Sequence, residues 1–141
     1  MNHAVIQNLI SKALAKQIRF SEILATLAKQ GVESYHVDFL RNEFRFYATS
    51  GESLLTGAAL VHDGVAAEFS AEKLEPINQK VQSGQAAYPD FVKEGTAAGC
   101  AYYIVYLNGK KVRYFGRGGG EHVQHFRGSS QQTLTRMERT S

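Results

Sequence analysis

Two residues capable of acid–base chemistry are spaced to share one face of a β-strand. His36 and Asp38 lie two positions apart in the alternating segment that follows Gly31, and residues at i and i+2 of a strand point to the same side. Histidine titrates near neutral pH, and a neighbouring carboxylate can orient its ring. Arg45 and Tyr47 have the same spacing further along the chain. The four side chains could form an acid–base cluster, although a solvated sheet face is the simpler explanation.

Histidine and acid occur together again near the end of the chain. Glu121, His122 and His125 invite a metal site, but an odd spacing places the two histidines on opposite faces of a strand. We therefore predict no metal ligands, no catalytic set and no cofactor. The enzymatic alternative is a small enzyme that uses His36 or His122 in a cleft between two halves of the chain.

A glycine-rich segment offers a candidate anion site. Residues 116–120 read Gly-Arg-Gly-Gly-Gly, and the backbone N–H groups of such a loop can wrap an anion. A Walker pattern is absent, and no helix obviously opens after the glycines, so a flexible hairpin loop is the simpler interpretation. Arg117 nevertheless stands where a carboxylate or phosphate could reach it.

The single cysteine, Cys100, follows Gly99 at the predicted end of a helix. A catalytic thiol needs a nearby base or a helix N-terminus to lower its pKa, whereas the helix end expected here is a C-terminus. We expect Cys100 to be a buried core residue. A lone cysteine also excludes an internal disulfide and fits a reducing compartment, so we expect a cytoplasmic protein.

An aromatic and cationic face is predicted near residues 101–116. Alternation along two paired strands places on it Tyr102, Ile104, Tyr106, Lys111, Arg113 and Phe115. This set is too apolar for open water, so a partner or another part of the chain should cover it. A homodimer or another protein partner is the first candidate, and a small anionic ligand is the second.

Charge and composition limit the other partner classes. The net charge is +3, and the tail 127–141 supplies +2 of it through three Arg and one Glu, which leaves about +1 for the body. This balance is too mild to predict nucleic-acid binding, so weak binding through the basic hairpin and tail remains a third alternative. No run of about 18 apolar residues is present, so we expect no membrane partner.

The elements that must position these residues are arranged as a repeat. A shift of 68 residues aligns 20–51 with 88–119 without a gap and with five identities, Gly31/Gly99, Tyr35/Tyr103, Val37/Val105, Arg45/Arg113 and Gly51/Gly119. We predict an α+β fold that duplicates a helix–helix–β-hairpin–strand unit, with helices on one face of a mainly antiparallel sheet. Repeat one should span about 3–69 and repeat two about 70–128, in one domain, with 129–141 as a polar, flexible tail.

Local signals place the ends of these elements. Ser21 and Pro89 are typical of helix starts, and Gly31 and Gly99 of helix ends. Asn108-Gly109 predicts a two-residue hairpin loop of type I′. Third strands are expected at 53–62 and 121–126, with a further strand at 65–69 after a turn at Asp63-Gly64. The hairpin faces assigned to the core carry Tyr35, Val37, Phe44, Phe46, Tyr103, Val105, Val112 and Tyr114.

The stretch from Gln82 to Phe126 carries recognisable motifs. They are Tyr88-Pro89, Ala98-Gly99-Cys100 and the run Tyr114-Phe115-Gly116-Arg117 with Glu121-His122-Val123. With these residues the chain resembles a bacterial and phage family of unknown function whose members are often labelled "phage envelope protein". The resemblance implies a compact α+β fold in bacteria or their prophages, and it carries over no catalytic residue.

Together these patterns favour a non-enzymatic module that binds a ligand or a partner. The candidate binding residues are Arg117, His122, Glu121, Tyr102, Tyr106, Lys111, Arg113, His36 and Asp38.

Overall fold

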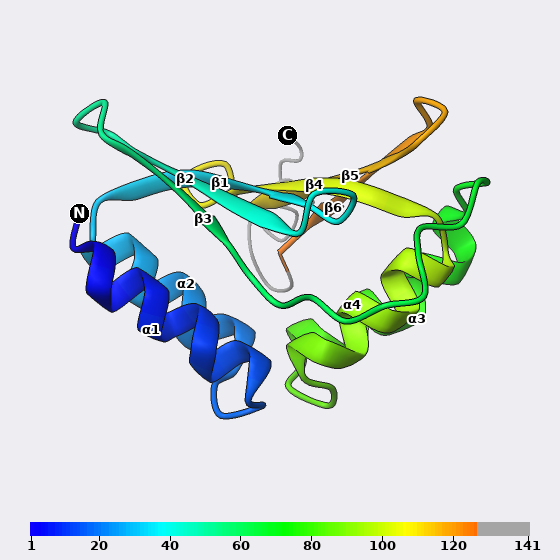
Figure 1. Cartoon of the computed structure of the whole chain (residues 1–141), viewed down its shortest axis with the longest axis horizontal. Coiled ribbons are helices and arrows are strands. Elements are labelled where there is room, and N and C mark those ends of the chain that lie inside the picture. The colour runs from blue at the N-terminus through cyan, green and yellow to red at the C-terminus, as the bar shows by residue number, and fades with distance from the viewer. Residues whose placement is uncertain (127–141) are drawn as a thin grey trace, which may run out of the picture.

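The computed structural model describes residues 1–126, which form an α+β fold of four helices and one six-stranded antiparallel sheet (Figure 1). The helices are α1 (His3–Leu14), α2 (Phe20–Lys29), α3 (Ala71–Gln82) and α4 (Tyr88–Ala97). The strands are β1 (Val32–Asp38), β2 (Glu43–Ala48), β3 (Ser53–Gly57), β4 (Cys100–Tyr106), β5 (Lys111–Gly116) and β6 (Glu121–His125). The predicted fold class is confirmed, and the predicted tail lies outside the described residues.

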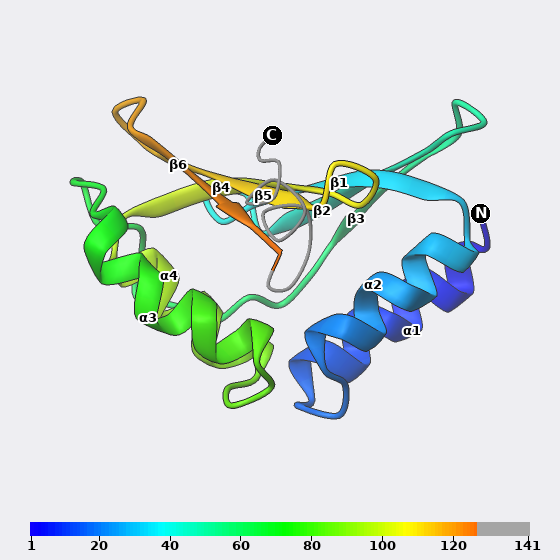
Figure 2. The same ribbon diagram turned by 180° about the vertical axis from the view of Figure 1, so that it is seen from behind.

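The sheet joins the two halves of the chain through its central strands. The strand order is β3-β2-β1-β4-β5-β6, so β1 pairs with β4 from Ser34 opposite Tyr106 to Asp38 opposite Tyr102. All four helices cover one face of this sheet, with α1 and α2 under β1–β3 and α3 and α4 under β4–β6 (Figures 1 and 2). Each half thus forms one layer of two helices beneath three strands.

The two halves follow the same order and spacing of elements. Each element of the second half begins 68 residues after its counterpart, as α3 at Ala71 follows α1 at His3 and β4 at Cys100 follows β1 at Val32. The lengths also agree, since α2 and α4 each have 10 residues and β1 and β4 each have 7. This correspondence supports the predicted duplication, which superposition of the two halves would test directly.

The core lies between the sheet and the helices. The eight hairpin side chains assigned to it are all buried, from Tyr35 at 5% exposure to Val105 at 0%. Buried positions alternate with partly exposed ones along β2 and β5, as expected for strands covered on one face. Leu27 of α2 and Phe91 of α4 pack against this set.

The helix starts differ from the prediction at Ser21. The helices α2 and α4 begin at Phe20 and Tyr88, one residue before Ser21 and Pro89. A carboxylate in the first turn of each helix accepts a hydrogen bond from the N-cap backbone: the N–H of Arg19 donates to Glu22 (2.9 Å) and that of Ala87 to Asp90 (2.9 Å). Ser21 therefore lies inside the first turn. The predicted helix ends are confirmed, because Gly31 (φ +78°) and Gly99 (φ +92°) adopt left-handed conformations.

The prediction of a two-residue type I′ loop at Asn108-Gly109 is wrong. Tyr106 pairs with Lys111, which leaves a four-residue loop, and the left-handed residue is Lys110 (φ +53°). Asn42, at the matching position of the first hairpin, has φ +54°. Four-residue loops are most often built around a type I turn. The two-residue and the four-residue loop give the same strand register, so Val105 still pairs with Val112 and Tyr103 with Tyr114.

The segment 58–70 contains no strand, so the prediction of a strand at 65–69 is wrong. The third strand of the first half ends at Gly57 rather than near residue 62 as predicted. The chain must travel from the edge strand β3 to the start of α3 under the other half (Figure 1). Its backbone groups bond to the end of α4 instead: Ala66 N–H donates to Thr96 O (3.0 Å) and Ser70 N–H to Ala98 O (2.8 Å).

The matched glycines Gly31 and Gly99 give the first prediction. Alanine at Gly31 should lower the free energy of unfolding by about 1–2 kcal/mol, the cost of a left-handed residue with a Cβ atom. At Gly99 that Cβ would also overlap the carbonyl of Glu68, whereas nothing lies within 4 Å at Gly31. Gly99→Ala should therefore cost at least about 2 kcal/mol more than Gly31→Ala. Urea unfolding of both variants measures the difference, and equal losses would refute the close approach of segment 58–70.

Candidate functional site

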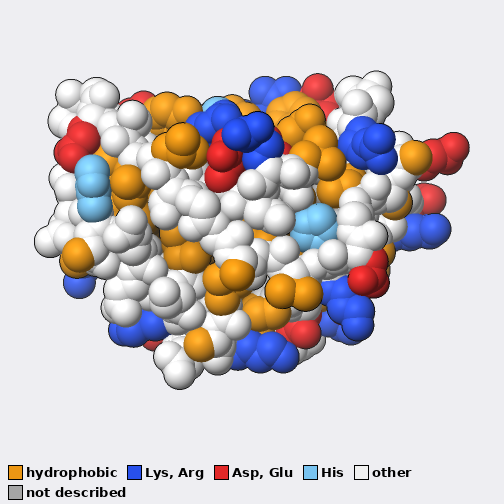
Figure 3. Space-filling model, in the orientation of Figure 1, with side chains coloured by type: hydrophobic (Ala, Val, Ile, Leu, Met, Phe, Trp, Pro, Cys, Tyr) orange, Lys and Arg blue, Asp and Glu red, His pale blue; other side chains and the backbone are white. Residues whose placement is uncertain are grey.

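The sheet face that points away from the helices carries most of the predicted site residues. We call it the outer face; its side chains are Ser34, His36, Asp38, Glu43, Arg45, Tyr47, Ser53, Leu55, Tyr102, Ile104, Tyr106, Lys111, Arg113, Phe115, Glu121, Val123 and His125. Figure 3 shows hydrophobic and cationic side chains side by side along the sheet side of the molecule. One row crosses all six strands: Leu55, Arg45, His36, Ile104, Arg113 and Val123.

His36 lies at the centre of this row. It pairs with Arg45 on one side and Ile104 on the other, and its ring packs at a tilt on Tyr47, with 5.0 Å between centroids. Partial burial lowers the pKa of His36, and the positive charge of Arg45 lowers it further. A neutral imidazole is therefore favoured in the folded protein.

Asp38 does not orient that imidazole. Its carboxylate accepts from the backbone N–H groups of Leu40 (2.9 Å) and Arg41 (3.0 Å), so it holds the turn between β1 and β2. Asp38 pairs with Glu43 across the hairpin, and Glu43 accepts from Arg45 (2.9 Å). Three members of the expected cluster, His36, Asp38 and Arg45, line one hollow of about 280 Å³, which Tyr47 does not line. No hydrogen bond joins the histidine to the acid within residues 1–126.

The second half of the outer face stacks cations on rings. The Lys111 ammonium lies 5.8 Å from the centre of the Tyr106 ring, and the Arg113 guanidinium lies 5.5 Å from that of Phe115. Arg113 also donates to Glu121 (2.6 Å). Tyr102, between the two halves of the face, is 38% exposed. Within residues 1–126 no helix covers this face, so the predicted covering would have to come from elsewhere.

His122 and Arg117 are separated from that face. His122 points to the helix side, where it bonds Glu75 of α3 (3.0 Å) and stacks on Tyr114, while its neighbour Glu121 is on the outer face. Arg117 donates to the carbonyl of Val65 (3.3 Å), which ties the glycine-rich loop to segment 58–70. The predicted residues therefore form one group on the outer face and two isolated contacts.

Cys100 is fully buried, as predicted. Burial raises the pKa of its thiol to about 12, so the reactive thiolate is scarce at neutral pH. The Cys100 thiol donates to the carbonyl of Tyr102 (3.4 Å). These features are typical of a core residue.

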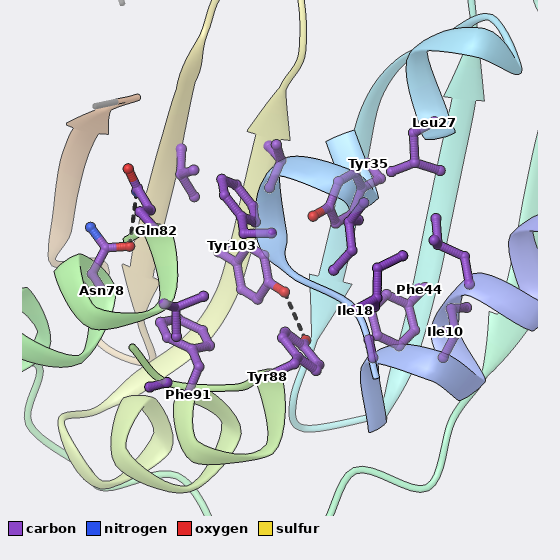
Figure 4. A pocket seen from close by; sticks show the side chains of 18 of the residues that line it. Ile10, Ile18, Leu27, Tyr35, Phe44, Asn78, Gln82, Tyr88, Phe91 and Tyr103 are labelled. Carbon is purple, nitrogen blue, oxygen red and sulfur yellow. Dashed lines mark hydrogen bonds between the residues drawn. The ribbon is translucent and has the colours of Figure 1, made fainter. Parts of the chain in front are cut away.

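A second candidate site, missed by the sequence patterns, lies beneath the sheet between the two helix pairs. Figure 4 shows this cleft, to which both halves contribute side chains. It holds about 70 Å³. Its lining includes Ile10, Ile18, Leu27, Tyr35, Phe44, Asn78, Gln82, Tyr88, Phe91 and Tyr103. No charged side chain and no histidine belongs to the part of the lining that the structure describes, so the enzymatic alternative gains no support there.

Polar atoms are buried along this apolar cleft. The hydroxyls of Tyr88 and Tyr103 bond each other at 2.7 Å (Figure 4). Asn78 is 3% exposed, and its Oδ1 accepts from the Tyr114 hydroxyl and from Gln82 Nε2. The Asn78 Nδ2 has no hydrogen-bond partner among the described residues. Burial raises the pKa of Tyr35, Tyr88 and Tyr103 well above the usual range, so all three hydroxyls stay protonated.

One sequence signal could have indicated the cleft. Asn78 follows Leu74 and Ile77 on the buried stripe of α3, and an amide at such a position needs partners inside the core. The remaining lining residues look like ordinary core in the sequence, because they come from helices and strands far apart in the chain. Only their arrangement in space leaves a gap between them.

Comparison with known proteins concerns mainly the second half of the chain. Residues 60–123 match the family described as "Protein of unknown function (DUF1398)". The match covers less than half of the chain, and it overlaps the stretch 82–126 that carries the predicted resemblance. It says nothing about the "phage envelope protein" label. No curated protein matches the chain.

Two further features restrict the chemistry of residues 1–126. None of their helices is both long enough and apolar enough to cross a membrane. Nowhere among them do three or more His, Cys, Asp or Glu side chains come together in a way that could hold a metal ion.

The lowered pKa of His36 predicts how stability depends on pH. Because the pKa of His36 in the folded protein lies below the unfolded value of 6.5, the neutral imidazole contributes stability that is complete above the unfolded pKa. This stability is lost as the pH falls through the folded pKa. Between about pH 7.5 and about pH 5, the wild type should lose more stability than His36→Gln. Urea unfolding at both pH values measures the two losses. Identical losses would show that the fold does not disfavour the charged imidazole.

Proposed function

We propose that the protein is a non-enzymatic binding module that takes a small, largely apolar molecule into the cleft between its helix pairs. The observation that carries this proposal is the Tyr35 hydroxyl, which points into a largely apolar cleft (Figure 4) and makes no hydrogen bond within residues 1–126. Pockets that combine apolar walls with a few inward polar groups are typical of small-molecule sites. The molecule would contact both halves, since Ile10 and Phe44 line the cleft from one and Phe91 from the other.

Burial of apolar surface would drive such binding. Each Å² of apolar area that leaves water contributes about 25 cal/mol before the costs of association. The cleft volume of about 70 Å³ is small beside the roughly 150 Å³ of a cavity that binds benzene. A ring-sized ligand therefore requires the helix pairs to part. They contact each other through α1 with α4 and α2 with α3, while the sheet holds the halves together above.

Filling the cleft should block binding. Ala13 of α1 lines it and is 7% exposed, so Ala13→Leu would occupy part of the space. Fluorobenzene, followed by ¹⁹F NMR, should bind the wild type in a saturable way and bind Ala13→Leu at least about fivefold more weakly, the effect of losing about 1 kcal/mol of contact. Ala4→Leu, on the exposed side of the same helix, should bind like the wild type. Non-saturable signals, or equal affinity for all three proteins, would refute the cleft as a binding site.

The outer face favours a second function, self-association. Tyr102 is 38% exposed and stands beside Phe115 on it, while Leu55 and Val123 are 61% and 39% exposed on its two edge strands. Contiguous apolar groups such as Tyr102 and Phe115 mark contact surfaces. The occupant we propose is a second copy of the chain. Every contact of an isologous dimer occurs twice. A twofold axis in the plane of the sheet and diagonal to the strands would place the acidic Asp38 and Glu43 of the first half opposite the basic Lys111 and Arg113 of the second half of the other copy.

A charge on this face should disrupt the dimer. Tyr106→Glu places a carboxylate among the side chains of the proposed contact, where burial of an unpaired charge is costly. Analytical ultracentrifugation should find a dimeric wild type and a folded, monomeric Tyr106→Glu variant. Val61→Glu is the matched control, because Val61 is 83% exposed in segment 58–70, away from the outer face. A wild type that sediments as a monomer at every concentration would overturn this second function.

A further inference from the structure

We infer that the ligand of the cleft is a neutral molecule with a hydrogen-bond acceptor, such as the carbonyl of a ketone, ester or amide. The inference rests on the proposed binding function and adds the chemical class of the ligand. It comes from the polar atoms of the lining, which have hydrogens to donate and no acceptor for them within residues 1–126.

Asn78 borders the cleft but does not donate into its open space. Its Oδ1 accepts from the Tyr114 hydroxyl and from Gln82 Nε2, and these two donors orient the side-chain amide. The Nδ2 group has no partner within residues 1–126, yet it is closed to water as well. A ligand in the open space of the cleft therefore meets other donors.

Tyrosine hydroxyls supply the donors that a ligand can meet. Tyr88 and Tyr103 share a single hydrogen bond, which uses one of their two hydroxyl hydrogens and leaves the second to be donated elsewhere. Tyr35 lies beside them in the cleft (Figure 4), and burial alone accounts for the raised pKa of its hydroxyl, with no hydrogen-bonding contribution. Two hydroxyl hydrogens are thus available in one small space.

The lining also sets the charge of the ligand. None of its side chains within residues 1–126 is Lys, Arg, His, Asp or Glu, so nothing in the described part of the cleft would compensate a carboxylate, a phosphate or an ammonium group. An unpaired charge is strongly disfavoured in such surroundings. A neutral carbonyl accepts the available hydrogens without that cost.

Three molecules of similar size test this class: acetophenone carries the carbonyl, ethylbenzene lacks an acceptor, and benzoate carries a charge. Each is titrated against fluorobenzene in a ¹⁹F NMR displacement assay. We expect benzoate to bind at least about tenfold more weakly than acetophenone, because its charge is unpaired in the cleft. Benzoate binding as tightly as acetophenone would overturn the neutral class.

One substitution tests the donors themselves. Tyr35→Phe removes a hydroxyl and keeps the ring. It should weaken acetophenone binding about fivefold, the effect of one net hydrogen bond, and leave ethylbenzene binding unchanged. Tyr47→Phe, on the outer face, should change neither. Tyr35→Phe should fold, because no hydrogen bond of the fold depends on that hydroxyl within residues 1–126.

The outcomes separate the two proposals. Acetophenone affinity that is the same in Tyr35→Phe as in the wild type refutes the acceptor class. Binding of ethylbenzene without binding of acetophenone also refutes it. In either case the cleft remains a site for apolar molecules. Failure of fluorobenzene, ethylbenzene and acetophenone alike to bind refutes the binding function and the ligand class together.

Discussion

The pairing of β1 with β4 is the interaction on which the rest of the structure depends. It joins two three-stranded units into one sheet, from Ser34 opposite Tyr106 to Asp38 opposite Tyr102. Each unit alone would expose one edge strand and part of its apolar face, a known liability of open sheets. The same pairing brings Tyr35 beside Tyr103 under the sheet and His36 beside Ile104 above it. Both candidate sites therefore form across the junction of the two halves.

The cleft is a consequence of how two helix pairs share one sheet. Each pair covers its own three strands, so the strip below β1 and β4 is covered only where the pairs meet. Large rings such as Phe44, Phe91 and Tyr103 fill most of this strip. A donor without a partner costs about 1–3 kcal/mol when it is buried, and a protein tolerates such a cost most readily at functional sites. The Tyr35 hydroxyl, which points into the cleft (Figure 4), is therefore more informative than the apolar residues around it.

The outer face shows how two copies of one backbone pattern can differ in chemistry. Glu43 and Lys111 occupy corresponding strand positions, as do His36 and Ile104, since each pair is 68 residues apart. The inner positions, in contrast, keep their character, as Tyr35 with Tyr103 and Val37 with Val105 do. Packing between sheet and helices restricts the inner residues to shapes that fill the core. The outer residues meet no such restriction within the described chain, so they are the positions where a binding surface can vary.

The sequence by itself determined the elements and the faces of the strands. Alternation predicted that Val37 and Val105 are buried and that His36 and Tyr102 are not, because side chains on a strand change face at every residue. Glycine predicted the ends of α2 and α4, because the left-handed conformation at Gly31 and Gly99 is strained for residues with a Cβ atom. These are local properties, and the chain within a few residues decides them.

Tertiary structure alone decided the features that depend on distant partners. Segment 58–70 contains a short alternating stretch but forms no strand, because it must cross to α3 and its N–H groups find the end of α4 instead. The strand order places β1 against β4, which no local pattern specifies. Asp38 bonds its own turn rather than His36, and Arg117 reaches Val65 rather than open solvent. The cleft depends most strongly on the tertiary structure, since its lining comes from helices and strands of both halves and becomes a site only when the helix pairs are placed side by side.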